Sequence, residues 1–430
     1  MGALAPRAIL LLSAAASLGQ AYFQIAKELL PLAQTPLHPL VLGEPGPASA
    51  VSPLTPLGYG LAQNTSDDFL VYHSPGFAGG RGISIVTTPA RIQRFAKVRA
   101  PSYANDFSSP PYEERPMPGK GRGLVATKTL HRGDRIFADT PILLLDAEAF
   151  GGGGDDDDYD DDDDEEEVEG VEVEEEQEED EIHSELAALA VSKLPPPMQR
   201  QFWNLHAQAG DDPVMDRIDP NAFELHIGGD AFFGVLPEMA RLNHDCRPNA
   251  VYSFDEATLT QRVHALADIA PGEEISIAYI SPVQSRAERL DALRASWGFE
   301  CSCSACSLPP ELTALSDRRV AETDRLLERL RGDGDGDGGE DDTKQKPQVA
   351  EALVSLFRQE RLWADAHEGW VLAARAYCAA GNYWDTLRHA HLAAEASALW
   401  GGAGSPDAVE MARLAEAPEG EACWMKAVKS

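Results

Sequence analysis

The residues best suited to chemistry lie in one short run, Leu242-Asn243-His244-Asp245-Cys246-Arg247-Pro248-Asn249. Two carboxamides, an imidazole and a thiol stand close together there, and a proline restricts the backbone between them. Asparagine and histidine side chains can donate and accept hydrogen bonds to a ligand, and a cysteine thiolate can bind a metal. We therefore take this run as the centre of a candidate binding site.

A second cluster of thiols lies downstream. Cys301, Cys303 and Cys306 have the spacing C-x-C-x-x-C, which brings three thiolates close enough to share one metal ion. A structural zinc site takes four ligands in a tetrahedral arrangement, and Cys246 is the obvious candidate for the fourth. We therefore expect one structural Zn²⁺ to join two segments that are distant in the sequence.

Strand-like segments flank the central run. Residues 251–254 and 259–265 alternate apolar and polar side chains across a short turn, which predicts two paired strands. After another turn, residues 274–280 form a further strand that ends near Tyr279. Residues 285–297 follow as an amphipathic helix, with Leu290 and Leu293 on its inner face.

A glycine-rich turn lies upstream, at Pro118-Gly119-Lys120-Gly121-Arg122-Gly123. It precedes an alternating run, and a second turn at residues 131–134 leads into the strand-like residues 135–145. This pattern predicts a β-hairpin. It does not predict a dinucleotide-binding fold, because the required order of strand, turn and helix is missing.

These motifs, in this order, resemble the SET domain of protein lysine methyltransferases. The matching segments are Asn243-His244-x-Cys246-x-Pro248-Asn249, then Gly272–Tyr279, then Trp297–Cys306. The spacing is most similar to SMYD-type enzymes and related fungal SET proteins, over about residues 111–308. The MYND zinc finger of SMYD-type enzymes has no counterpart here, so its partner-binding role is not carried over. The resemblance implies an α+β fold of small curved antiparallel sheets with a helical insert and a post-SET zinc segment.

The same resemblance implies an activity, namely S-adenosylmethionine-dependent methyl transfer to a lysine amine of a histone or another protein. Tyr279, at a strand end, would project into a narrow apolar channel and orient the amine. Zinc would be structural, closing the post-SET segment over the site. The residues implied to contact the cofactor are Lys120, Gly121, Arg122, Gly123, Asn221, Asn243, His244, Tyr279 and Phe299.

Two other functions remain open. A SET fold without activity would act as a scaffold that binds protein partners through its helical tail and acidic loop. A zinc–thiolate redox protein would release zinc on mild oxidation and would have no affinity for the cofactor. The presence of Asn243, His244, Tyr279 and the glycine-rich turn favours the enzyme.

A chain of 430 residues predicts two or three structural units. Proline and glycine dominate the region before the SET-like segment, and tetratricopeptide-like spacing of alanine and aromatic residues follows it, with a break at Gly381-Asn382. The expected divisions are a signal peptide at 1–21, a loop-rich and partly disordered region at 22–110, a SET domain at 111–281, a post-SET segment at 296–308 and helices over 311–430.

The formal net charge of −35 is concentrated in one segment. Residues 155–181 hold 21 acidic residues and no basic one, so the other residues carry −14. Like charges at this density repel, and we expect residues 150–182 to be a disordered insertion. The acidity of the remainder argues against direct nucleic-acid binding and favours a basic, lysine-rich protein substrate or partner, although solubility alone would also explain it.

Residues 1–21 have the pattern of a signal peptide, with Arg7 before an apolar stretch and a small residue, Ala21, at the cleavage position. The apolar stretch is too short to span a bilayer, and the sequence offers no other transmembrane candidate. The pattern predicts the secretory pathway. The nucleus or cytoplasm is the alternative, because thiolate zinc sites and this cofactor suit a reducing compartment. We expect a monomer.

Six cysteines over this length do not predict a disulfide framework. Four of them belong to the expected zinc site. Cys378 and Cys423 fall in segments with a helical pattern, and we expect them to be core residues or free thiols.

Overall fold

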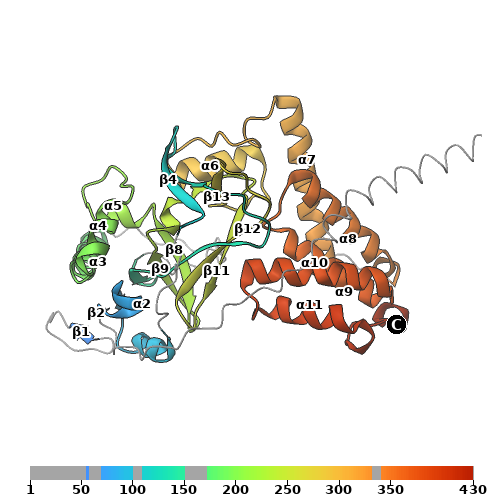
Figure 1. Ribbon diagram of the computed structural model, residues 1–430, viewed down its shortest axis with the longest axis horizontal. Coiled ribbons are helices and arrows are strands. Elements are labelled where there is room, and N and C mark those ends of the chain that lie inside the picture. Colours follow the sequence, from blue (N-terminus) through green and yellow to red (C-terminus); the bar gives the residue numbers. More distant parts are fainter. Residues whose placement is uncertain (1–54, 58–68, 100–108, 151–171, 332–339, 430) are drawn as a thin grey trace, which may run out of the picture. The chain divides into compact units, whose positions relative to one another are not determined.

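The computed structural model describes residues 55–57, 69–99, 109–150, 172–331 and 340–429 (Figure 1). The expected signal peptide and most of the acidic insertion, residues 151–171, lie outside the described residues. Within the described ranges, every helix is too short or too polar to cross a bilayer.

Three small β-sheets and a helical C-terminal region confirm the predicted α+β class. The sheets have the strand orders β1-β2-β3-β7-β9-β8, β10-β13-β5-β4 and β11-β12-β6. Pairing is antiparallel except between β3 and β7 and between β10 and β13. The bounds are β1 Thr55–Leu57, β2 Leu70–Ser74, β3 Ile83–Thr87, β4 Tyr112–Met117, β5 Gly121–Ala126, β6 Arg135–Asp139, β7 Leu143–Asp146, β8 Ala222–Ile227, β9 Asp230–Val235, β10 Asn243–His244, β11 Ala250–Asp255, β12 Thr260–Ala265 and β13 Glu274–Ile277.

Residues 69–99 correct the expectation of a loop-rich segment over 22–110. β2 pairs with β3, β3 pairs with β7, and the 3-10 helix η1 (Arg91–Lys97) follows. Every residue of β3 is buried, because the strand lies inside the sheet between two neighbours. Residues 83–86 are strand-like in the sequence after a glycine-rich turn, but the partner β7 comes much later in the chain and could not be predicted.

The predicted hairpin between residues 118–126 and 135–145 is wrong. β5 pairs with β4 and β13, whereas β6 pairs with β12 in another sheet. The glycine-rich turn does form a hairpin, but with the preceding strand β4. The alternation of apolar and polar residues in β5 is compatible with the predicted and with the observed pairing. Burial of Leu124 in the core, and not this alternation, decides which strands β5 joins.

Three helices form the insert between β7 and β8: α3 (Glu172–Ser192), α4 (Pro196–Trp203) and α5 (Met215–Ile218). The predicted disorder of residues 150–182 is therefore wrong for its last part, because α3 begins at Glu172. Glutamate is a good helix former, and the helix continues into a part in which Ala187 and Ala190 are fully buried.

The C-terminal region is helical, as predicted. Asn382 caps α10 by accepting a hydrogen bond from the Asp385 backbone N–H, which confirms the expected break at Gly381-Asn382. Buried alanines such as Ala374 and Ala393 let α10 pack closely against α9, with α11 on its other side (Figure 1). The bounds are α6 Arg286–Trp297, α7 Pro310–Arg331, α8 Glu340–Glu360, α9 Ala366–Ala379, α10 Tyr383–Gly401, α11 Pro406–Glu416 and α12 Lys426–Lys429.

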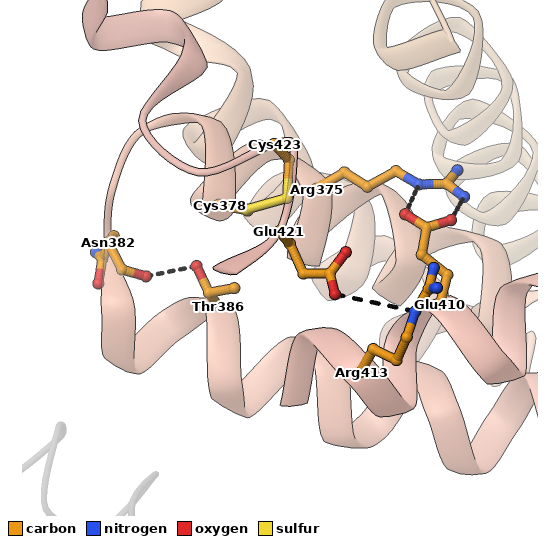
Figure 2. The surroundings of a disulfide bond; sticks show 8 residues. All are labelled: Arg375, Cys378, Asn382, Thr386, Glu410, Arg413, Glu421 and Cys423. Carbon is orange, nitrogen blue, oxygen red and sulfur yellow. Dashed lines mark hydrogen bonds and ion pairs between the residues drawn. A yellow bond between two sulfur atoms is a disulfide. The ribbon is translucent and has the colours of Figure 1, made fainter. Parts of the chain in front are cut away.

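A disulfide joins Cys378 of α9 to Cys423, which corrects the expectation of core or free thiols (Figure 2). The two residues lie 45 positions apart, and nothing in their local sequence pairs them. They meet because the chain after α11 returns to the end of α9. There the Met425 backbone N–H donates to the Cys378 carbonyl over 2.9 Å.

Replacing Cys423 with serine is expected to lower the free energy of unfolding by about 2–4 kcal/mol, because the disulfide restricts a long loop of the unfolded chain. Chemical denaturation of the full chain measures the change. The wild-type protein in strong reductant should lose the same amount, and the variant should be insensitive to the reductant. A wild-type curve unchanged by full reduction would contradict the prediction.

Candidate functional site

The short strand β10 brings the chemically distinctive segments together. Asn243 pairs with Ser276 and His244 pairs with Ile277 of β13. On its other side β13 pairs with β5, which begins in the glycine-rich turn. The central run, the end of β13 near Tyr279 and the turn are therefore neighbours in one sheet.

Glu274 of β13 connects the turn to the central run. Its Oε1 accepts a hydrogen bond from Asn243 Nδ2 over 2.8 Å, and its Oε2 lies 2.9 Å from Lys120 Nζ. Lys120 Nζ also lies 3.4 Å from the His244 carbonyl oxygen. The result is a half-buried cluster of one cation, one anion and one amide at the edge of the turn.

Two glycines of the turn serve different purposes. A Cβ at Gly123 would lie 2.6 Å from Asn243 Nδ2 and 2.7 Å from Met117 Cγ, so close packing requires glycine there. Gly121 has φ +72, and a Cβ on it would meet nothing within 4 Å. The backbone at Gly121 thus borders open space beside the Lys120–Glu274–Asn243 cluster.

Gly123→Ala is expected to lower the free energy of unfolding by about 1–3 kcal/mol and to displace the Asn243 amide from Glu274, because the added methyl group overlaps both neighbours. Denaturation curves measure the first effect, and calorimetry with S-adenosylmethionine measures the second. Gly404→Ala is a matched control, since a Cβ at Gly404 meets nothing within 4 Å. Equal behaviour of the two variants would contradict the prediction.

The His244 imidazole lies between Tyr279 and the cysteines. Its Nδ1 accepts the Tyr279 backbone N–H over 3.0 Å, and its Nε2 lies 3.2 Å from Cys246 Sγ. Burial lowers the pKa of His244 to about 4, so the ring is neutral near pH 7 and its proton is on Nε2. The Tyr279 hydroxyl donates to the Leu242 carbonyl over 2.7 Å, so both ends of this tyrosine are held by the central run.

Tyr279 also forms part of the wall of a cavity of 520 Å³. Phe223 and Tyr252 line the same cavity as a T-shaped pair with ring centroids 5.7 Å apart, and the Trp297 ring lies 5.4 Å from Tyr279. The wall also includes the Asp219 carboxylate. Burial raises the pKa of Tyr279, so its hydroxyl keeps its proton at neutral pH.

The four cysteines predicted to share a metal lie together and are all buried. Their Sγ atoms lie within 4.8 Å of one another, with Cys246 3.5 Å from Cys306 and 4.0 Å from Cys301. Tetrahedral zinc with Zn–S bonds of about 2.3 Å requires sulfur–sulfur separations of about 3.8 Å. The spacing and the donor set of four sulfurs therefore fit zinc.

The surroundings of these thiols favour negative charge on sulfur. The buried Arg289 guanidinium lies 4.0 Å from Cys306 Sγ, and the Cys306 backbone N–H donates to Cys303 Sγ over 3.4 Å. Such outer contacts orient metal ligands and offset their charge.

The family model of the SET domain matches residues 121–280. Over that stretch this chain is similar to SET-domain proteins. It is 26% identical to histone-lysine N-methyltransferase set5 of Schizosaccharomyces pombe over 234 residues, which are 53% of this chain and 61% of that protein. It is 29% identical to N-lysine methyltransferase SMYD2 of Bos taurus over 164 residues, 34% of each chain. It is 37% identical to SMYD2-B of Danio rerio over 113 residues, 25% of this chain and 26% of that protein. The chain thus spans less than two thirds of the length of each of these relatives.

Of the predicted cofactor contacts in this SET domain, Lys120, Gly123, Asn243 and His244 lie around Glu274. Gly121 borders the open space next to them. Their role toward a cofactor stays a prediction, but the structure brings all five to one place.

The other predicted contacts lie on the cavity, at the surface and beside the cysteines. Asn221 lines the cavity with Tyr279, and its Nδ2 donates to two backbone carbonyls of the insert, at 2.8 and 2.7 Å. Arg122 is half-exposed and forms an ion pair with Glu114 of β4. The Phe299 ring lies 6.2 Å from the His244 ring and packs beside the cysteines.

Sequence reasoning missed Glu274 and the aromatic cavity wall. The sequence predicts the strand that carries Glu274 but not its partners, which come from the turn and the central run. Phe223, Tyr252 and Trp297 come from three separate segments. The available signal was the aromatic residues in segments that flank the central motif, but which strand faces the cavity depends on tertiary packing.

Proposed function

We propose that this protein transfers a methyl group from S-adenosylmethionine to a lysine side-chain amine of a protein substrate. The observation that supports this most is the position of Tyr279. Tyr279 lines the cavity. Its backbone N–H donates a hydrogen bond to His244, and its hydroxyl group donates one to the Leu242 carbonyl. One residue thus joins the cavity to the asparagine–histidine segment.

S-adenosylmethionine would supply an electrophilic methyl group on a sulfonium. The residues at the glycine-rich turn suit it, because the open space at Gly121 lies next to the Lys120–Glu274–Asn243 cluster. That cluster offers a cation, an anion and an amide, and the amino-acid end of the cofactor carries both an ammonium and a carboxylate group. Lys120, Gly121, Asn243 and His244 would hold it, with Phe299 at the post-SET side.

The cavity suits a neutral amine. A free lysine amine has a pKa of about 10.4, and burial among aromatic rings lowers it by penalising the charged form. Phe223, Tyr252 and Trp297 supply aromatic surroundings on part of the wall. Tyr279 would orient the amine nitrogen through its hydroxyl group, which remains protonated.

Zinc in the four-cysteine cluster would have a structural role. It would fix residues 301–306 to Cys246 and thereby support the neighbouring His244 and Phe299. Four thiolates fill the coordination sphere and leave no open position for a substrate, so zinc would not act as a Lewis acid.

Two measurements on the full chain test the proposal. Calorimetry measures S-adenosylmethionine binding, and transfer of a labelled methyl group into histones or a protein extract, followed by acid hydrolysis, shows whether methyl-lysine forms. Binding with incorporation into lysine supports the enzyme. Binding without any incorporation favours the scaffold, and zinc release on mild oxidation without cofactor binding favours the redox protein.

We also propose that the chain enters the secretory pathway, on the signal-peptide pattern of residues 1–21. The Cys378–Cys423 disulfide supports this, because disulfides persist in oxidising compartments. The N-terminal residue of protein purified from a eukaryotic host tests it. An intact Met1 on intracellular protein would favour the nucleus or cytoplasm.

A further inference from the structure

A buried carboxylate at the end of α8 lies in the contact between the C-terminal helices and the central run. Glu360 Oε2 accepts hydrogen bonds from Arg247 Nη2 over 2.9 Å and from Ser316 Oγ over 2.6 Å, and its Oε1 accepts one from Arg319 Nε over 2.6 Å. The side chains of Arg247 and Glu360 are 2% and 5% exposed. Although burial raises the pKa of Glu360, these hydrogen bonds lower it below its ordinary value, so the carboxylate is ionised.

Arg247 connects this carboxylate to the metal site. It follows Cys246 directly in the chain, and its Nη1 donates to the Cys246 carbonyl over 2.7 Å. The Arg247 guanidinium therefore binds the Cys246 carbonyl through Nη1 and Glu360 of α8 through Nη2. Its backbone N–H also donates to Asp245 Oδ1 over 2.8 Å, which fixes the turn around Cys246.

Two further contacts join the same helices to the other cysteines. Arg286 Nε donates to the Cys306 carbonyl over 2.7 Å, while the Arg286 backbone N–H donates to Asp317 of α7 over 2.9 Å. Arg361, just after α8, donates to Ser304 Oγ over 2.8 Å. The segments that carry the metal ligands are thus held to α7 and α8 at three points.

We propose that α7 and α8 act as an outer support of the cysteine metal site, with Arg247 as the positioning residue that transmits their docking to Cys246. Zinc retention then depends on the C-terminal helices, although they contribute no ligand. A partner or modification that loosens α8 would loosen the metal segment as well. The inference rests on zinc occupancy of the cysteines and is independent of methyl transfer.

The test measures zinc in the full-length protein, first as metal content per chain and then as the rate of release to a zinc-binding dye under conditions where every variant is folded. Arg247→Met and Glu360→Gln are expected to release zinc about 10–100-fold faster than the wild type, as loss of an outer partner of a metal ligand typically does. Arg247→Lys keeps the charge and should be intermediate. The double variant should be no faster than the faster single variant, because both changes remove one shared interaction.

Two controls separate positioning from general destabilisation. Glu368→Gln removes an exposed ion pair with Arg331 between α9 and α7 and should release zinc at the wild-type rate. Cys423→Ser removes the disulfide at α9 and destabilises the C-terminal region away from the metal site. The folded variant should also release zinc at the wild-type rate.

Wild-type release rates in Arg247→Met and Glu360→Gln, or equal acceleration in Cys423→Ser, would overturn the inference while leaving the zinc site intact. Single-variant effects that multiply in the double variant would also contradict it. A wild-type protein purified without zinc that also fails to bind added zinc would overturn both the metal site and this inference.

Discussion

Tyr279→Phe should reduce methyl incorporation by about 100–1,000-fold, the usual cost of removing one positioned hydrogen-bonding group from a reaction centre. The phenol hydroxyl lies in the cavity wall and is fixed by the Leu242 carbonyl. Phenylalanine keeps the ring and its packing against Trp297, so the cavity and the fold should remain. The loss should therefore appear in kcat more than in KM, because the role proposed for the hydroxyl group is to orient the amine and not to hold the substrate chain.

Labelled methyl transfer at saturating cofactor measures the change. Calorimetry should show a cofactor affinity within about threefold of the wild type, which is a smaller change in binding free energy than the 1.4 kcal/mol of a tenfold difference. Tyr377→Phe is the matched control. Its hydroxyl also donates a hydrogen bond, to Glu351 Oε1 over 3.0 Å, but it lies in the C-terminal helices away from the cavity. Undiminished incorporation in Tyr279→Phe would remove this residue from the reaction and weaken the proposed function.

Cys246→Ser has the second of the two largest expected effects. A serine hydroxyl group is a poor zinc ligand, and the remaining three thiolates lose the residue that joins them to the central run. Zinc affinity should fall by more than the 10–100-fold that loss of an outer partner costs, and metal content should drop from about one ion per chain to a small fraction. Cofactor binding should fall too, because Cys246 lies 3.2 Å from His244 Nε2, and His244 holds Tyr279.

Metal content by mass spectrometry and thermal unfolding with and without a chelator check this outcome. The chelator should lower the melting temperature of the wild type and leave Cys246→Ser unchanged. The double variant Cys378→Ser/Cys423→Ser also lacks two cysteines, those of the disulfide, but it should retain its zinc and its response to the chelator. Full zinc content in Cys246→Ser would show that the four sulfurs do not form the metal site.

Short motifs carried most of the correct predictions. The spacing of Cys301, Cys303 and Cys306 limits how far apart their sulfurs can lie, so their proximity was a local inference, and the structure places Cys246 with them. The same holds for the break at Gly381-Asn382, where an asparagine side chain caps the next helix. Such features depend on residue type and a few intervening residues, and sequence alone contains both.

The errors arose where a local pattern allowed several distant partners. The strand-like run at residues 83–86 was recognised, but its place in a sheet was not, because its neighbour β7 is far away in sequence. β5 was paired with the wrong strand because the alternation of apolar and polar residues is the same in either sheet. Cys378 and Cys423 carried no mark of their pairing. In each case the choice depends on which surfaces are buried together, and that is a property of the whole chain.

The sequence by itself indicated the likeness to the SET domain, the group of four cysteines and the choice of Tyr279, because each rests on residue types within short motifs. Only the tertiary structure decided that Glu274 joins the turn to Asn243, that Phe223, Tyr252 and Trp297 from separate segments line one cavity, and that Glu360 pairs with Arg247 next to Cys246. Those contacts form between segments whose separation along the chain sets no distance. Burial of apolar surface and the pairing of buried charges bring them together.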